Sequence, residues 1–318
     1  MMADIPIIDL SRPDGECAAA IGAACARIGF YAVTGHGIPA AQIDALHAAA
    51  RTFFDLPAAE KCRVARPRPE QNRGYIGRGD ETLARLAGQT TPPDDKEVFT
   101  IGPIDTGTDA YFTRPEAYPH FAPNLWPERP AVLRPAMEAY WHAATALARR
   151  LLRLSAIALD LAPSHFDAST RRHISMLRLI DYPAPDRAPA PGQLRAGEHT
   201  DLNMLTLVAG STDIGGIEVR RRDGAWIPVP HAPGLIAVNI GDVLMRWTND
   251  RWVSTPHRVA NAPPGSGVRR QSAAFFFQAE YDAELACLPS CISAENPARY
   301  AATTIGAYRA ARFAKTAG

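Results

Sequence analysis

The sequence predicts a β-rich α+β fold: a double-stranded β-helix (jelly-roll) core with an N-terminal α/β segment and supporting helices. Two observations carry this prediction. Helical patterns dominate the first half of the chain, whereas after Ser164 the sequence breaks into short β-type runs separated by turn signals. Because these runs do not alternate with helical patterns, as βαβ units would, the predicted sheets are antiparallel.

We expect residues 1–318 to form one continuous unit, since no sharp boundary separates its two halves. Within this unit, residues 1–165 form a mainly helical N-terminal part. Residues 166–290 form the jelly-roll core with the candidate metal site, and residues 291–318 form a C-terminal helix.

The first half of the chain contains three helical patterns. The Ala-rich segment 15–28 predicts one helix, and residues 39–54 predict a second, with Ile43, Leu46, Ala50 and Phe53 on one stripe. Residues 63–130 are rich in Pro, Gly and charge and predict irregular connections with short helices. The longest pattern, 130–161, carries an apolar stripe that predicts a core helix; His142 lies off this stripe, which predicts a surface position.

The second half predicts strands and a final helix. Arg222-Asp-Gly224 between two β-type runs is a strong hairpin signal. A helical pattern returns over residues 296–314. The predicted strands cover residues 174–182, 199–208, 216–221, 225–229, 235–239, 243–247, 258–261 and 272–280.

The balance of charged residues and the lack of long apolar runs argue against nucleic acid and membranes as binding partners. The chain has 34 basic and 33 acidic residues and a net charge of +1, which favours neither nucleic acid nor a membrane surface. No apolar run reaches the roughly 18 residues needed to span a bilayer. The N-terminus lacks a basic region followed by an apolar run, so we expect no signal peptide and a cytoplasmic protein with five reduced cysteines. We expect a monomer that acts on a small molecule.

Two histidines and one aspartate have the spacing of a metal site. His199 and Asp201 lie two positions apart in a predicted strand, so their side chains point to the same face, and His257 follows in a later segment. Two imidazoles and one carboxylate suit non-haem Fe(II), with coordination positions left for oxygen and a co-substrate. Because imidazole must be neutral to bind, metal affinity should fall below roughly pH 6.

Arg270 and Ser272 form a second pair on one strand face, while Arg269 points to the opposite face and is expected to be solvated. The ordered set His-x-Asp, His, Arg-x-Ser closely resembles the 2-oxoglutarate-dependent dioxygenases of the isopenicillin N synthase-like family. The resemblance covers roughly residues 5 to 290. It includes Ile5–Leu10, Gly29–Pro39, Phe53-Phe54 with Leu56-Pro57, Glu60-Lys61, Arg73-Gly74-Tyr75 and Leu177–Pro183.

The resemblance implies a cofactor set and an activity. Fe(II) would be held by His199, Asp201 and His257, and would bind O2 and the co-substrate 2-oxoglutarate. The distal carboxylate of 2-oxoglutarate would meet Arg270, whose planar fork matches a carboxylate, and Ser272. Tyr182 is a further candidate hydroxyl donor to the co-substrate. The implied reaction oxidises an unactivated C–H bond, by default through hydroxylation, and releases succinate and CO2; desaturation and ring closure are family variants.

Residues that contact the substrate are harder to find, because the pocket is assembled from distant segments. Asn203 shares strand parity with His199 and Asp201, and could bind substrate or support the metal ligands. The turn Asn239–Asp242 resembles a structural turn of the family, in which Gly241 serves backbone geometry. The other candidates for substrate contact are Arg73, Tyr75, Arg246 and Phe276.

Three other functions are compatible with parts of this pattern. An oxidase of the same fold could use O2 without 2-oxoglutarate and keep Arg-x-Ser to bind a substrate carboxylate. A non-catalytic metal- or ligand-binding protein could share the scaffold. A zinc hydrolase would need a general base, but no nearby Glu is convincingly placed for it.

Overall fold

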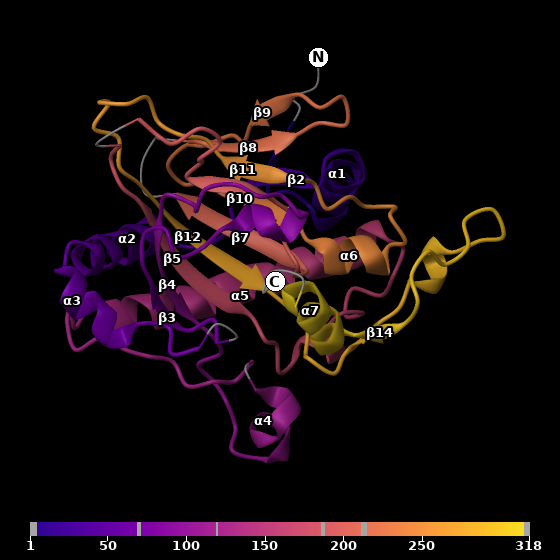
Figure 1. Ribbon diagram of the computed structural model, residues 1–318. Helices are drawn as coiled ribbons and strands as arrows, with labels where there is room; N and C mark the ends of the chain where they lie inside the picture. Colours follow the sequence, from indigo (N-terminus) through magenta and orange to yellow (C-terminus); the bar gives the residue numbers. More distant parts are fainter. Residues whose placement is uncertain (1–4, 69–70, 119, 186–187, 211–214, 315–318) are drawn as a thin grey trace.

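Two β-sheets face each other in the computed structural model, which describes residues 5–68, 71–118, 120–185, 188–210 and 215–314 (Figure 1). The large sheet contains, from edge to edge, β1 (Ile7–Asp9), β2 (Phe30–Thr34), β10 (Ile236–Ile240), β7 (Leu205–Gly210), β12 (Arg270–Phe277), β5 (Met176–Tyr182), β4 (Glu97–Ile101) and β3 (Gly74–Ile76). Only the edge pair β1–β2 runs parallel among these described strands.

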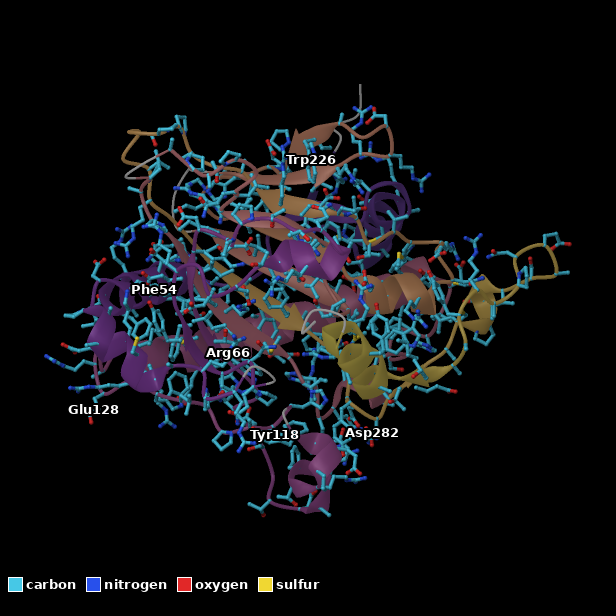
Figure 2. All side chains as sticks on the ribbon, in the orientation of Figure 1. Phe54, Arg66, Tyr118, Glu128, Trp226 and Asp282 are labelled. Atoms are coloured by element: carbon cyan, nitrogen blue, oxygen red, sulfur yellow. The ribbon has the colours of Figure 1, made fainter. Side chains whose placement is uncertain are left out.

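The small sheet contains β6 (Ala196–His199), β11 (His257–Val259), β8 (Ile217–Arg220) and β9 (Trp226–Pro228). Figure 1 shows β8, β9 and β11 grouped above the strands of the large sheet, and Figure 2 labels Trp226 on the outer strand β9. β8 and β9 pair antiparallel around residues 221–225, so the predicted hairpin is confirmed. The two sheets make the double-stranded β-helix core that the sequence predicts.

Strand alternation divides the large sheet into a core face and a cavity face. On β5, Leu177 and Leu179 are fully buried in the hydrophobic core, whereas Arg178 and Tyr182 line a cavity between the sheets. On β12 the fully buried Phe275 faces the core, and residues 270, 272, 274 and 276 line the cavity. This period of two is the physical reason that a few strands can carry both a core and a site.

Three long helices cover the core face of the large sheet. α5 (Leu133–Ala158) contacts β7 and β12, and α1 (Asp14–Arg27) and α2 (Ala40–Phe54) pack against α5. The predicted stripe of α5 is buried from Met137 to Leu154 and partly buried at Ala158. Pro135 lies in the first turn, where its missing N–H costs no helical hydrogen bond. All three helices therefore confirm the sequence patterns, with ends shifted by three residues or fewer.

Shorter elements complete the fold. The 3-10 turn η2 (Leu83–Ala87) packs against β6, and α6 (Asp242–Trp247) follows β10. α7 (Ile305–Ala314) ends the described chain, next to a small pair, β13 (Glu284–Leu285) and β14 (Thr303–Thr304). The others are α3 (Ala58–Lys61), η1 (Cys62–Val64), α4 (Ala110–Thr113), η3 (Pro115–Ala117), η4 (Ala168–Thr170) and η5 (Pro289–Cys291).

Four expectations were wrong in detail. Residues 243–247 form the helix α6 instead of a strand, because a short apolar run fits either structure and Val243, Leu244 and Trp247 are buried at helical spacing. The expected strand 199–208 is interrupted: β6 ends at His199 and β7 begins at Leu205. The expected irregular region 63–130 contains β3 and β4, and the C-terminal helix starts at Ile305 instead of Asn296.

Within the described residues, no helix is both long enough and apolar enough to cross a bilayer.

Candidate active site

The small sheet and the loop after β6 bring His199, Asp201 and His257 together. His199 and His257 are cross-strand neighbours at the ends of β6 and β11, with ring centroids 4.4 Å apart. The Nε2 atoms of His199 and His257 lie 3.8 Å from Oδ1 and Oδ2 of Asp201, respectively. The three potential ligand atoms all lie within 4.8 Å of one another, so one metal ion fits between them.

Asp201 reaches this position by a route that the sequence did not predict. It lies beyond the end of β6, in a turn over residues 200–204, so strand parity with His199 does not place it. The turn is held by α6 and the residue before it: Asp242 N donates to Asp201 O at 2.8 Å, and Gly241 N donates to Met204 O at 2.9 Å. The backbone of the turn therefore docks on the start of α6.

Neighbouring groups orient each of the three side chains. Nδ1 of His199 lies 2.7 Å from Gly197 O, and Nδ1 of His257 lies 3.1 Å from Thr255 O. Since a carbonyl only accepts, each Nδ1 carries the proton and each Nε2 lone pair faces the centre. Oδ2 of Asp201 accepts hydrogen bonds from Thr206 Oγ1 at 2.5 Å and Asn239 Nδ2 at 2.7 Å, which fixes the carboxylate.

The environment sets the charges needed for metal binding. Burial, and next the neighbouring His257, lowers the pKa of His199 to about 4. Its imidazole is therefore neutral at physiological pH and stays neutral below pH 6, where the sequence predicted that metal affinity would begin to fall. Burial alone would raise the pKa of Asp201, but the two imidazoles and the hydrogen bonds from Asn239 and Thr206 outweigh it and lower the pKa. Two nitrogen donors and one carboxylate are a set that Fe(II) accepts.

A buried guanidinium lies in the same cavity. Arg270 is 2% exposed, and its Nη1 lies 3.4 Å from Ser272 Oγ on the same face of β12. Tyr182 is its cross-strand partner, and the Arg270 Cζ lies 4.9 Å from the Tyr182 ring centroid. In the described part of the chain, Arg270 Nε has no hydrogen-bond partner and no carboxylate pairs with the guanidinium. A carboxylate ligand would supply the missing acceptor and charge.

The neighbouring Arg269 differs from its expected solvated state. It points to the other face, as predicted, but its guanidinium pairs with the buried Asp181 at 2.8 Å and with Asp55 at 2.5 Å. Its side chain is 22% exposed. Arg269 therefore ties β12 to β5 and to the end of α2, and takes no part in the cavity.

Two of the five candidate substrate residues line the cavity, Asn203 and Phe276. Asn203 Nδ2 donates to Leu205 O at 2.6 Å and to Thr206 Oγ1 at 3.1 Å. Thr206 in turn donates to Asp201, so Asn203 supports the candidate metal ligand through one intermediate. Phe276 belongs to the cavity face of β12, two residues beyond Ala274.

The other three candidates lie outside the lining of this cavity. Arg73 is buried and donates to the carbonyls of Asn72, His120 and Ala122, which fastens the loops around it. The Tyr75 hydroxyl donates to Glu97 at 3.0 Å.

Arg246, on α6, lies over the rings of Tyr300 and Tyr308, at 4.2 and 4.9 Å. Arg73, Tyr75 and Arg246 thus hold loops and helices in place. Sequence position alone could not reveal this role, because the residues that they contact come from distant segments.

Four further charged residues, outside the motifs of the sequence, line the cavity: Glu81, Lys96, Arg178 and Arg309. One signal could have found Arg178, since it lies four positions before Tyr182 in a predicted strand and therefore shares its face. Glu81 and Lys96 come from the region expected to be irregular, and Arg309 from the C-terminal helix. For these three, only the tertiary structure indicates proximity.

Comparison with known proteins agrees with this geometry. Residues 5–129 match the family model "non-haem dioxygenase in morphine synthesis N-terminal", and residues 173–279 match "2OG-Fe(II) oxygenase superfamily". Validamycin A dioxygenase of Streptomyces hygroscopicus subsp. limoneus is 33% identical over 300 residues, covering 90% of this chain and 80% of the relative.

Two further similarities concern a relative and a solved structure. Proline hydroxylase buaE of Petromyces alliaceus is 34% identical, covering 87% of this chain and 86% of the relative. The crystal structure of a full-length Neurospora crassa protein in complex with alpha-KG has a TM-score of 0.85 and 30% identity, covering 98% of this chain and 96% of that one.

Proposed function

Because this chain belongs to the 2OG-Fe(II) oxygenase superfamily, we propose that it hydroxylates an unactivated C–H bond of a small molecule. The family assignment makes the chain a 2-oxoglutarate-dependent dioxygenase, with Fe(II) and 2-oxoglutarate as cofactors. In the proposed reaction one oxygen atom of O2 enters the substrate as a hydroxyl group. The other enters the succinate that 2-oxoglutarate becomes on losing CO2.

The observation that carries the proposal is the presence of two complementary groups in one cavity. His199, Asp201 and His257 converge on one point, and Arg270 lines the same cavity from the large sheet, with no carboxylate partner among the described residues. We assign the first set as ligands of Fe(II) and Arg270 with Ser272 as the binding site of the distal carboxylate of 2-oxoglutarate. Tyr182 is the third proposed contact of the co-substrate, through its hydroxyl.

The chain's own residues hold and orient the reactants. When bound, ferrous iron supplies the redox chemistry that activates O2 with the electrons of 2-oxoglutarate. Asn239 and Thr206 keep Asp201 ionised and fixed, and the carbonyls of Gly197 and Thr255 keep both histidines in the ligating tautomer. The apolar walls of the cavity, such as Leu202, Val208 and Ile217, exclude water from the reacting centre.

Hydroxylation is the preferred outcome because it needs no group beyond those proposed, and because relatives such as proline hydroxylase buaE carry that activity in their names. An oxidase of the same fold that ignores 2-oxoglutarate, and a non-catalytic binding protein, are the alternatives that the experiment must separate. Both would keep the three metal ligands. The oxidase would consume O2 but no 2-oxoglutarate, and the binding protein would consume neither.

Succinate release and O2 uptake by the iron-loaded protein, with 2-oxoglutarate and a panel of small molecules, test the proposal. We expect succinate to rise with one class of compound, in step with O2 uptake, and a product heavier by one oxygen atom. Asp201→Ala is the control and should abolish succinate release and weaken iron binding. Oxygen uptake without succinate would favour the oxidase, and bound iron with neither reaction would favour the binding protein.

A further inference from the structure

The cavity has two ends, and the end away from Arg270 carries charge of its own. Along β5, Tyr182, Ile180, Arg178 and Met176 line the cavity in turn. Tyr182 faces Arg270 across the β5–β12 pair, whereas Met176 faces Phe276. Arg178 lies four positions before Tyr182 on this strand, a distance of about 13 Å. A co-substrate carboxylate at Arg270 therefore leaves the Arg178 end for the substrate.

Arg178 belongs to a fixed cluster of charges at this end. Its Nη2 donates to Glu81 Oε1 at 2.8 Å, and Lys96 Nζ lies 2.9 Å from Glu81 Oε2. Lys96 also contacts Asp94 Oδ2 at 2.8 Å, and Asp94 Oδ1 accepts from Gly197 N at 2.9 Å. Both oxygens of Glu81 thus face cations, so this carboxylate is compensated and poorly suited to bind a cationic ligand.

The guanidinium of Arg178 keeps donors for another partner. The side chain is 11% exposed, and its hydrogen bond to Glu81 is the one it makes within the described part of the chain. Nε is buried without an acceptor among those residues. The Glu81 carboxylate that accepts this hydrogen bond also pairs with Lys96. A guanidinium held on a cavity wall with donors to spare is a site for a planar anion.

The C-terminal helix adds a second cation to the cavity lining. Arg309 of α7 lines the cavity and is 7% exposed. α7 is anchored close to the candidate metal ligands, because Tyr308 donates to Asp242 Oδ2 at 3.0 Å and Thr200 Oγ1 donates to the same oxygen at 3.4 Å. Thr200 lies between His199 and Asp201. The helix that carries Arg309 is therefore tied, through Asp242, to the turn that carries Asp201.

Apolar side chains surround these charges. Leu83 and Leu86 of η2, Leu202 of the turn after β6, and Met176 and Phe276 of the large sheet line the cavity. A ligand here would meet hydrocarbon on several sides and a guanidinium on one. This combination matches a mostly apolar molecule with one carboxylate.

We propose that the substrate carries a carboxylate that binds Arg178, with Arg309 as a second contact, while its apolar part lies along Leu83, Leu86 and Phe276. This arrangement presents a C–H bond of the apolar part to the centre formed by His199, Asp201 and His257. The inference rests on the proposed function, because it takes the Arg270 end to be filled by 2-oxoglutarate. Arg178 is then a specificity-determining residue.

Matched carboxylate and amide probes test this inference by binding, without turnover. The protein is loaded with Mn(II) and 2-oxoglutarate, and calorimetry measures the Kd of 3-phenylpropionate, octanoate and indole-3-propionate and of their primary amides. We expect at least one carboxylate to bind about tenfold or more tightly than its amide, since only the charged partner forms a charge-assisted pair. Arg178→Gln should remove this preference while leaving the Kd of 2-oxoglutarate unchanged.

Two variants keep the test interpretable. Arg153→Gln, at an exposed position of α5, should retain the carboxylate preference. If Arg178→Gln does not fold, Arg178→Lys serves instead: a point charge replaces the planar fork, so the preference should fall but not vanish. Failure of every carboxylate to bind, equal binding of carboxylates and amides by the wild type, or an unchanged preference in the Arg178 variant overturns the proposal.

Succinate release separates failure of the dioxygenase function from failure of the carboxylate-bearing substrate class. If neutral compounds alone stimulate succinate release, the dioxygenase function stands and the carboxylate-bearing substrate class is wrong. If no succinate is formed with any compound, the proposed function fails, while the binding comparison still decides whether Arg178 holds a carboxylate.

Discussion

Arg270 is a buried guanidinium without a carboxylate partner in the described part of the chain, so its charge is compensated only when an anion enters the cavity. We predict that Arg270→Ala raises the KM for 2-oxoglutarate by roughly 10- to 150-fold, because a charge-assisted hydrogen bond contributes about 1.5–3 kcal/mol. Steady-state kinetics with varied 2-oxoglutarate measures this. Arg269→Ala, on the opposite strand face, is the control and should change that KM far less. An unchanged KM in Arg270→Ala would remove Arg270 from its proposed role.

His173 is a histidine whose surroundings keep its imidazole neutral. Its ring stacks on Trp141, with centroids 5.8 Å apart, and lies 4.9 Å from the ring of Phe277. Burial lowers its pKa to about 4. The unfolded chain, with an imidazole pKa of about 6.5, therefore binds one more proton than the folded chain between about pH 4 and 6.5.

This difference predicts a pH dependence of stability. The stabilisation is fully present above about pH 6.5 and is lost as the pH falls toward 4, with a slope of at most about 1.4 kcal/mol per pH unit from this residue. Urea unfolding of the metal-free protein across this range measures the slope. His173→Gln should make it shallower, whereas His142→Gln, at an exposed site, should not. Equal slopes for wild type and His173→Gln would contradict the prediction.

At the scale of elements, the junction between β10 and α6 positions the turn that carries Asp201. A Cβ added to Gly241 would lie 2.2 Å from Asn203 O and 2.8 Å from Asp201 O, so only glycine lets the turn approach this closely. The family resemblance assigned Gly241 a backbone role. The structure shows that this role is the close approach of the Asn203 and Asp201 carbonyls. The neighbouring Asp242 then joins this turn to α7 through Thr200 and Tyr308.

We predict that Gly241→Ala pushes this turn away from α6, weakening iron binding and lowering the free energy of unfolding by about 1–3 kcal/mol, as overpacking usually does. Iron titration and urea unfolding measure the two effects. Gly15→Ala is the matched control: nothing lies within 4 Å of its added Cβ. A helical Ala there should be neutral or stabilise by up to about 1 kcal/mol. Iron affinity equal to wild type in Gly241→Ala would refute this role.

At the scale of the whole molecule, one hydrophobic cluster joins the segments 1–165, 166–290 and 291–318 into which the sequence divides the chain. It contains Ile21 of α1, Leu151 of α5, Phe275 of β12 and Ile305 of α7. We propose that these parts unfold together, because no segment has a separate core of similar size among the described residues.

We predict that Leu151→Ala, in this cluster, lowers the free energy of unfolding by about 2–5 kcal/mol and leaves a single transition. Far-UV circular dichroism and the fluorescence of the five tryptophans should report the same midpoint. Val132→Ala, 58% exposed just before α5, should shift the midpoint little. Two separated transitions in either probe would mean that the helical part and the jelly-roll core unfold independently.

Local patterns allowed much of this molecule to be predicted. The stripe of α5, the hairpin β8–β9 and the alternation of β5 and β12 each depend on residues close in sequence, whose periods of 3.6 or 2 place side chains on one face. The same reasoning correctly placed Arg270 and Ser272 together. It failed for residues 243–247, where a short apolar-rich run fits a strand or a helix, and packing on the Asp201 turn decided for a helix.

The sequence by itself determined the fold class and the pairing of Arg270 with Ser272, because both depend on local periods. Its resemblance to a known family indicated that His199, Asp201 and His257 lie together. Only the tertiary structure decided how Asp201 reaches its place and which residues from distant segments join the cavity lining. Glu81, Lys96 and Arg309 come from the segment before η2, the β4 region and α7. Contacts between such distant segments depend on how the sheets and helices pack, and no local period encodes that packing.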